Sequence, residues 1–547
     1  MNTKKKQWHL LNDKEEGSLL ERVLKARNLN QGFLDKKIWH DPFLFRDMGQ
    51  VVSRIKEAIK RKERIMIFGD YDADGVTAST ILFKFLKSLG AQVSVRLPHR
   101  QRDGYGLKKD FFDDWKKLNV KLVITVDCGI SNIREISYAQ SLGIEVIVTD
   151  HHTPHQELPS ALILNPKLTE DSYPFSDLVG AGVALKLVQA LITDLKFSRE
   201  LSRKHFLSSV TYAAIGTVAD CAPLVNENRS IVSCGLQSMR HMENKEIEAL
   251  ISVAGLDKKN IDTDSIGFAL APRINAAGRL GDPLLALSLF LGDKSKAREL
   301  ENLNCRRRKV SQELVARARE NFSESESAFV FGAPDLHEGI IGLVAGNISE
   351  EFMVPSVVMT EREDYFVASC RSPANFNLIA ILEKLSDLFV HFGGHREAAG
   401  FRMKKGNESL FRERFLALCQ EKLEEEAPVV KINIDTTISL SEISTDNFDS
   451  LEDLAPFGIG NPRPNFLLRQ VRVKNLKKIG SDRNHLSFLV QDGNVSREVI
   501  AFFWGECDHL FQGEVDLVGE IIADEFRGNR KAKLKLLDVR VPEIKQT

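Results

Sequence analysis

Three aspartates, Asp70, Asp72 and Asp74, lie within five residues in the stretch FGDYDADGVT, directly after the apolar run RIMI. Like charges this close repel one another and raise each other's pKa unless a cation lies between them. Asp and Gly are also ordinary turn residues. The cluster is therefore either a solvated turn or part of a cation site.

Two further apolar runs end in residues of the same kind. In KLVITVDCG the apolar run is followed by Asp127, and in IEVIVTDHH it leads to Asp150, His151 and His152. If these runs are parallel strands, their carboxyl ends meet at the edge of the sheet where ligands bind in open α/β folds. Carboxylates mixed with imidazoles favour Mn²⁺ or Mg²⁺ over a thiolate-bound zinc. The residues predict a metal site for two ions rather than a turn.

The elements around these residues alternate between apolar runs and helical patterns from about residue 64 to 150. This alternation predicts an α/β domain with a parallel sheet covered by helices on both faces. Helices then dominate to about residue 320 and end in a long charged helix, and a smaller α/β unit follows. After a linker, short β patterns predict a C-terminal β-barrel. The predicted divisions are an irregular N-terminal arm (1–50), a catalytic domain (51–235), a helical connector (236–325), a second α/β domain (326–425) and the barrel (430–547).

The composition of the 547 residues, 43% hydrophobic and 28% charged, is that of a soluble globular protein with several domains. Without a membrane-spanning run or a secretory signal we expect a cytoplasmic protein. The seven cysteines are scattered without a CxxC pair, which disfavours a disulfide framework or a thiolate zinc site. The net charge of -1 neither suggests nor excludes a nucleic-acid partner.

The stretches DYDADG, VDCG, TDHH and GTVAD stand in the order and approximate spacing of the DHH phosphoesterase family, which this chain resembles. The resemblance implies hydrolysis of phosphodiesters or phosphoanhydrides with two divalent ions, Mn²⁺ or Mg²⁺. It also implies that Asp70 lies near the metals and that His152 faces the scissile phosphate. The implied metal ligands are Asp72, Asp74, Asp127, His151 and Asp220.

Three more stretches, APRINAAGR, ASCRS with HFGGHREAAG, and PFGIGNPRP, are similar to the RecJ family of single-strand-specific 5′ to 3′ DNA exonucleases. Phe68 stands where pyrophosphatases and nanoRNases of the wider family have a histidine. The resemblance implies a DHH domain joined by a long helix to a DHHA1 domain, followed by an OB-fold. It also implies degradation of single-stranded DNA to mononucleotides in repair and recombination by a monomer, with a single-strand-binding protein and a helicase as further partners.

Candidate DNA contacts follow from the same stretches. Arg273 and Arg279 are either surface ion pairs on a helix or, with the resemblance, contacts to backbone phosphates, since a guanidinium binds phosphate bidentately. Glycines let a backbone approach a ligand and an imidazole can donate to phosphate, which makes Gly394 and His395 candidates, although such a stretch is more often a plain turn.

The resemblance assigns Arg100, Arg371 and Ser372 to a pocket for the 5′-terminal phosphate. The run RRRK (306–309) is interpreted as a solvated face.

The predicted barrel combines charge with aromatic residues. Residues 466–485 hold six Lys or Arg against one Asp, and aromatic residues lie nearby at Phe466, Phe488, Phe502, Phe503 and Trp504. OB-folds hold single strands by attraction to the backbone and by base stacking, whereas some of these rings are expected in the core.

Two other classes of function stay open. A small-molecule phosphodiesterase has no need of the barrel. A catalytically inactive replication scaffold is expected to have broken metal motifs, and here all five ligand positions are filled.

Overall fold

The structure, a computed structural model, describes residues 6–541 apart from 15, 105, 324–325, 375, 426–429 and 527–528. The chain divides into two compact units, Ile38–Pro428 and a smaller one that joins Met1–Lys37 to Val429–Thr547. The predicted linker at 426–429 lies outside the described residues. No helix in the described part of the chain is long and apolar enough to cross a membrane.

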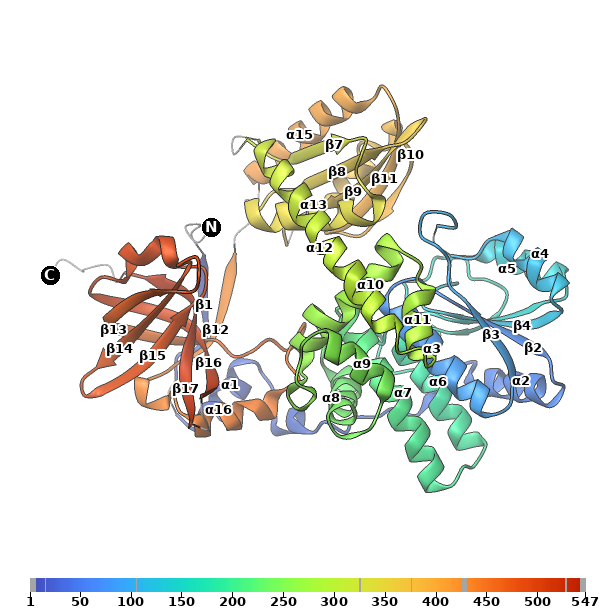
Figure 1. Cartoon of the computed structure of the whole chain (residues 1–547), viewed down its shortest axis with the longest axis horizontal. Coiled ribbons are helices and arrows are strands. Elements are labelled where there is room, and N and C mark those ends of the chain that lie inside the picture. Colours follow the sequence, from blue (N-terminus) through green and yellow to red (C-terminus); the bar gives the residue numbers. More distant parts are fainter. Residues whose placement is uncertain are drawn as a thin grey trace. The chain divides into compact units, whose positions relative to one another are not determined.

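A parallel sheet forms the first layer of the larger unit, as predicted (Figure 1). Its strand order is β3-β2-β4-β5-β6. Side chains alternate between two cores along β2 and β4, because α3 and α6 cover one face and α4 and α5 the other. The strands are β2 (Arg64–Gly69), β3 (Gln92–Arg96), β4 (Val120–Val126), β5 (Glu145–Thr149) and β6 (Leu162–Leu164), and the helices are α3 (Ala73–Ser88), α4 (Lys109–Lys117), α5 (Ile133–Ser141) and α6 (Gly180–Asp194).

Helices that follow in the chain join the same core, which extends from Phe45 to Leu300. They are α7 (Arg199–Ala219), α8 (Asn226–His241), α9 (Lys245–Val253), the π-helical segment η4 (Ser265–Leu270), α10 (Ala271–Leu280), α11 (Leu284–Phe290) and α12 (Lys296–Glu320). The boundary predicted after residue 235 lies inside α8, and helices on both sides of it share one core.

The second α/β part of the larger unit has a mixed sheet in the order β10-β11-β9-β8-β7. Only β7 and β8 pair in parallel. Its strands are β7 (Phe329–Ala333), β8 (Ser356–Glu361), β9 (Tyr365–Arg371), β10 (Phe389–Gly394) and β11 (Ala398–Lys404), with helices α13 (Glu338–Phe352), α14 (Leu378–Glu383) and α15 (Glu408–Glu425).

The smaller unit is a barrel closed by five strands, because β13 pairs with both β14 and β16 at the ends of the order β13-β14-β15-β17-β16. This confirms the predicted C-terminal barrel. The barrel strands are β13 (Phe466–Ile479), β14 (His485–Asp492), β15 (Val495–Ala501), β16 (Glu514–Phe526) and β17 (Asn529–Arg540).

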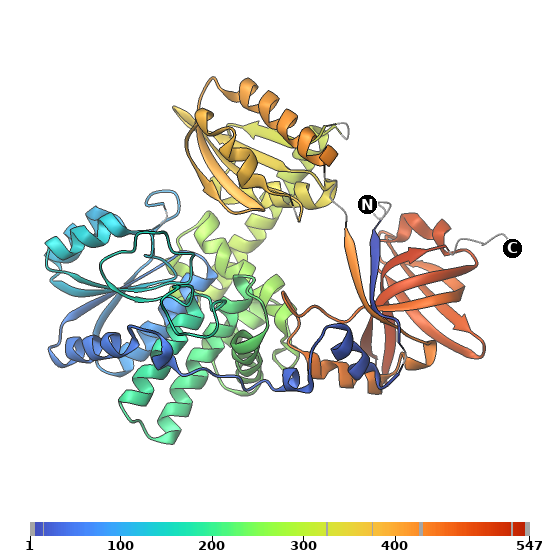
Figure 2. The same cartoon turned by 180° about the vertical axis from the view of Figure 1, so that it is seen from behind.

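The predicted irregular arm (1–50) differs from what is observed. Strand β1 (Gln7–Asn12) pairs in parallel with β12 (Lys431–Thr437), which continues the sheet of the barrel (Figures 1 and 2). Helix α1 (Leu19–Ala26) buries Leu19, Val23 and Leu24 in the barrel core. Helix α2 (Met48–Lys60) instead packs in the core of the larger unit. The partner of β1 is more than 400 residues away, so no local pattern marks it as a strand.

Candidate metal centre

The first carboxylates of the site come from the turn between β2 and α3. Asp70 follows β2, and Asp72 is the N-cap of α3, where its side chain accepts from the backbone N–H groups of Asp74 and Gly75, both at 3.0 Å. Asp is a preferred N-cap because it satisfies donors that the first turn leaves free. The cap therefore fixes where Asp74 points from the first turn of α3.

Asp74 is held by the start of a second helix. Its two carboxylate oxygens accept from the N–H groups of Gly180 at 2.7 Å and Ala181 at 2.9 Å, at the N-terminus of α6. A Cβ added to Gly180 would lie 2.5 Å from Cβ of Asp127. The glycine thus lets α6 approach both carboxylates closely.

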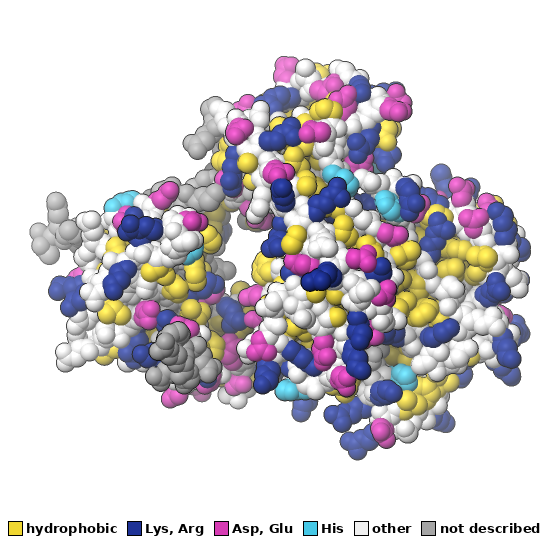
Figure 3. Space-filling view, in the orientation of Figure 1, with side chains coloured by type: hydrophobic (Ala, Val, Ile, Leu, Met, Phe, Trp, Pro, Cys, Tyr) yellow, Lys and Arg dark blue, Asp and Glu magenta, His cyan; other side chains and the backbone are white. Residues whose placement is uncertain are grey.

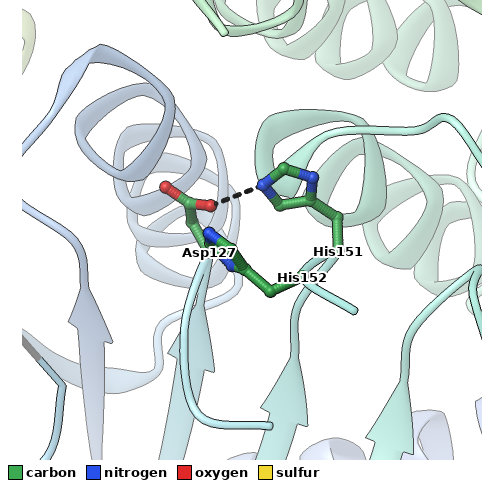
Figure 4. Close-up of side chains that lie close together, drawn as sticks. All are labelled: Asp127, His151 and His152. Carbon is green, nitrogen blue, oxygen red and sulfur yellow. Dashed lines mark ion pairs between the residues drawn. The ribbon is translucent and has the colours of Figure 1, made fainter. Parts of the chain in front are cut away.

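Asp127, His151 and Asp220 complete the group. Asp127 directly follows β4 with φ of 60°, and His151 follows β5. Nε2 of His151 lies 3.0 Å from Oδ1 of Asp127 (Figure 4). The same nitrogen lies 3.8 Å from Oδ2 of Asp74 and 3.7 Å from Oδ2 of Asp220, the C-cap of α7. The structure thus brings all five predicted metal ligands together with Asp70 and His152.

The buried acids of this edge resist ionisation. Burial raises the pKa of Asp74 and of Asp127 well above the usual range, and neighbouring carboxylates raise them further. Burial and the charge of Asp72 raise the pKa of Asp70 to about 8 and that of Asp220 to about 6. A cation bound here would offset both the burial and the repulsion between carboxylates, because a nearby positive charge favours the ionised form of each acid.

The pKa values of the two histidines are shifted in opposite directions. Burial and the nearby His152 lower the pKa of His151 to about 3, so its ring is neutral and can act as a ligand. Burial also opposes the charge on His152, but the hydrogen bond and charge of Asp150 raise its pKa overall. Nδ1 of His152 lies 2.7 Å from Oδ1 of Asp150, and this contact orients the ring.

The donor set fits a hard divalent cation. Three groups of residues could each hold a metal ion, because within each group the ligand atoms lie within 4.8 Å of one another. The groups are Asp127, His151 and His152; Asp74, His151 and Asp220; and Asp70, Asp72 and Asp127. Oδ1 of Asp127 is buried and has no hydrogen-bond partner among the described residues, so its contact with His151 is not a hydrogen bond. Oxygen-rich donors with one neutral imidazole suit Mn²⁺ or Mg²⁺.

A cluster of arginines adjoins this centre, over the region of α10, α12 and α13 where Lys, Arg and His side chains gather in Figure 3. Burial lowers the pKa of Arg279 to about 10, and the charges of Arg100, Arg307 and Arg371 lower it further. The Arg100 guanidinium lies 5.3 Å from the centre of the Tyr71 ring, next to Asp70. Positive charges that destabilise one another this way favour an anionic ligand.

The other predicted contacts are placed differently. Arg273 forms an ion pair with Glu301 at 2.5 Å and donates to the carbonyl of Ala269, so its guanidinium is engaged inside the protein. Ser372 directly follows Arg371 at the end of β9, and its N–H donates to the carbonyl of Glu397. Gly394 and His395 lie one strand further, at the end of β10, because β11 lies between β9 and β10 in the sheet.

Three groups were missed in the sequence. Asp150 stands in the TDHH stretch but was given no role, although it orients His152. Asn275 accepts from the N–H of Ala73 at 2.8 Å and ties α10 to the start of α3. Arg307, within the run interpreted as a solvated face, is half-buried and close enough to lower the pKa of Arg279. A run of four basic residues on one helix gives no signal that distinguishes the member facing inward.

Comparison with known proteins gives matches along most of the chain. The DHH family N-terminal domain matches residues 64–216, the DHHA1 domain residues 325–425 and the RecJ OB domain residues 434–538. The single-stranded-DNA-specific exonuclease RecJ of Bacillus subtilis is 34% identical over 92% of this chain, which spans 65% of that protein's length. The protein of the same name from Salmonella typhimurium is 32% identical, over 94% of both chains.

A solved structure resembles the whole fold. The crystal structure of Thermus thermophilus RecJ in complex with Mn²⁺ superposes with a TM-score of 0.86 and 29% identity, over 98% of this chain and 80% of that one. The same protein is also known in complex with Mg²⁺, with a TM-score of 0.78. With the three domain matches in this order and relatives above 30% identity over nearly their full length, the chain belongs to the RecJ family of DHH proteins.

Proposed function

We propose that this chain is a metal-dependent exonuclease that degrades single-stranded DNA from the 5′ end and releases mononucleotides, in DNA repair and recombination. The observation that carries the proposal is the group of buried acids and one neutral imidazole at the sheet edge, next to a cluster of arginines. The activity in the names of the RecJ relatives and the Mn²⁺ and Mg²⁺ of the Thermus structures support it.

Asp72, Asp74, Asp127, His151 and Asp220 are the proposed ligands of two Mn²⁺ or Mg²⁺ ions. Such ions would polarise the phosphodiester and promote attack by water in an in-line displacement. The protein's part is to fix the ligands before substrate arrives. The amides of α6 hold Asp74, and the cap of α3 holds Asp72.

His152 and Asp70 act on the reacting groups in this proposal. With Nδ1 tied to Asp150, His152 can donate from Nε2 to an oxygen of the scissile phosphate. Its raised pKa keeps it protonated nearer neutral pH than an ordinary histidine. Asp70 belongs to the same group of ligand atoms as Asp72 and Asp127, which places it beside the proposed metals.

The polarity of the reaction requires a group that holds one strand end at a fixed distance from the metals, since the metals hydrolyse whichever phosphodiester is placed over them. Arg100, Arg279, Arg371 and Ser372 are the proposed pocket for a 5′-terminal phosphate. Such a phosphate carries more negative charge than an internal diester. The Arg371 guanidinium is partly buried, and burial and the charge of Arg100 lower its pKa, so it gains from an anion there.

The substrate implies the setting. Cytoplasmic repair intermediates expose single strands with 5′ ends, a helicase generates them, and a single-strand-binding protein coats them. The enzyme is proposed to act as a monomer.

The direct test is degradation of strands labelled at either end, single or duplex, with Mn²⁺ or Mg²⁺. A label at the 5′ end should be released at once as a mononucleotide, whereas a 3′ label should stay on shortening products. Degradation from the 3′ end, or equal activity on duplex, would overturn the proposal. Activity confined to dinucleotides would favour a small-molecule phosphodiesterase.

The end pocket has a test of its own. Arg371→Ala should slow degradation of 5′-phosphorylated strands far more than that of 5′-hydroxyl strands, because only the former lose a charge-assisted contact. Arg414→Ala, which removes a surface pair with Asp387 in the same part of the chain, is the matched control and should change neither rate. Equal losses on both strands would remove Arg371 from the pocket.

A further inference from the structure

Phe268 is the most exposed of the large apolar side chains that the structure describes, with 83% of its surface open to solvent. It does not lie in a loose loop. Its neighbours Ile266 and Leu270 are fully buried, and η4 is a π-helical turn that runs directly into α10. π-helical turns are rare and recur at functional sites. The backbone is anchored while the ring is held in water.

The position of Phe268 follows from the path of α10. Next to it, Gly267 faces Val218, two residues before Asp220, since a Cβ added to this glycine would lie 3.6 Å from Cγ1 of Val218. Further along α10, Asn275 is hydrogen-bonded to the start of α3, between Asp72 and Asp74. Arg279 lies near the far end of the helix.

The helix therefore passes the metal centre in its middle. At 1.5 Å per residue, Arg279 is about 6 Å along the axis of α10 from Asn275, and Phe268 lies in the opposite direction, before the helix begins at Ala271. Asn275 and Arg279 are four residues apart, close to one turn, so their side chains project along one side of α10, and Phe268 precedes them in the π-helical turn. A strand whose end lies at the arginine cluster and whose scissile phosphate lies over the metals continues towards Phe268.

We infer that Phe268 is a stacking platform for a base of the strand on the uncut side of the metal centre and contributes to single-strand selectivity. This inference rests on the proposed function. A base in a duplex is already stacked and paired, whereas a base in a single strand can turn its face to an aromatic ring. Stacking needs no particular base, as suits an enzyme that must degrade any sequence.

The test compares Phe268→Ala, Phe268→Leu and Phe268→Tyr on strands of increasing length. Base stacking on a protein aromatic predicts about five- to a hundredfold weaker binding of long single strands by Phe268→Ala. Phe268→Leu should bind long strands nearly as weakly as Phe268→Ala, because it keeps apolar area but no ring. Phe268→Tyr, which keeps a ring, should bind them as the wild type does. Hydrolysis of a 5′-phosphorylated dinucleotide, which is too short to reach the ring, should be unchanged in all three.

Leu118→Ala is the matched control, since Leu118 is 51% exposed but precedes β4 at the opposite edge of the sheet. It should bind long strands as the wild type does. Melting temperatures measured alongside identify any variant that is merely unfolded. The inference would be overturned if Phe268→Leu bound long strands as well as the wild type does. It would also be overturned if Phe268→Ala lost as much activity on dinucleotides as on long strands, or lost no binding at all.

These outcomes are distinct from failure of the proposed function. If the wild-type protein does not hydrolyse single strands with Mn²⁺ or Mg²⁺, the proposed function fails. If it does, and Phe268→Ala degrades long strands at the wild-type rate and affinity, only the role of Phe268 fails.

Discussion

Two groups of carboxylates, one in each compact unit, differ in whether a basic side chain pairs with them. In the smaller unit Asp435 accepts two bonds from the guanidinium of Arg27, at 2.6 and 3.1 Å, and Glu442 pairs with the buried Arg22. At the sheet edge of the larger unit, no Lys or Arg among the described residues forms an ion pair with any of the five aspartates (Asp70, Asp72, Asp74, Asp127 and Asp220).

The difference distinguishes carboxylates that stabilise the fold from carboxylates that are available to a ligand. A buried charge with its own cation is part of the fold, and removing one partner leaves the other uncompensated. A group of buried acids without one raises its own pKa values, which costs stability and is kept where a ligand supplies the charge.

Removal of Asp127 should have the largest effect. Asp127→Ala is expected to reduce hydrolysis of single strands to below about a hundredth of the wild-type rate, because a proposed metal ligand is lost. The melting temperature without metal should hold or rise, since one member of a repelling group is gone. Retention of more than that rate would mean that the site is misplaced.

Removal of Asp435 should do the reverse. Asp435→Ala leaves the Arg27 guanidinium without its carboxylate and is expected to cost about 3–5 kcal/mol of unfolding free energy for the smaller unit, as for other broken buried pairs. Denaturant unfolding measures this loss. Dinucleotide hydrolysis by folded protein should persist. A stable variant would show that the pair contributes little to the fold.

A smaller effect is expected from Asp150→Asn, which keeps the shape of the side chain but removes the charge that orients His152. Loss of such supporting contacts typically lowers activity by about 10- to 100-fold. The pKa of His152, followed by NMR, should fall, because the hydrogen bond and charge of Asp150 are what raise it. A fall in rate with an unchanged pKa would assign Asp150 a purely structural role.

The pH dependence of stability should be the smallest effect. With metal removed by a chelator, the folded protein keeps protons on Asp70 up to about pH 8, whereas unfolded Asp loses its proton near 3.8. His152 also binds a proton more tightly in the folded state above pH 6.5. The unfolded state thus binds fewer protons between pH 6.5 and 8, and stability falls as the pH rises, by at most about 1.4 kcal/mol per pH unit for each group.

Melting temperatures at pH 6.5 and 8.0, in chelator and in saturating Mn²⁺, measure this dependence. The fall should occur in chelator and be absent with Mn²⁺, because the cation replaces the protons. A melting temperature that rises with pH in chelator would contradict the predicted pKa shifts.

The metal centre was predictable because its residues follow strand ends. Asp127 and His151 are separated in the sequence, but each lies within two residues of the end of a strand, and parallel strands bring such ends to one edge. The barrel and the parallel sheet followed from patterns of the same kind. These are features in which residue type and position along the element are sufficient.

Other features depend on contacts that no local pattern contains. The orientation of His152 depends on a hydrogen bond to Asp150, and the ion pair of Arg273 depends on a glutamate one helix away. The exposure of Phe268 is a property of the packed fold, since an apolar residue in a helical pattern is ordinarily expected to be buried.

The pairing of β1 with β12 has a consequence for how the chain is made. His9 of β1 lies beside Asn433 of β12, 424 residues later in the sequence. At about 5–20 residues per second of translation, β1 leaves the ribosome tens of seconds before its partner exists. The larger unit can fold in that interval, while α1 keeps its apolar face unburied. A chaperone that covers this face during synthesis would protect the nascent chain from aggregation.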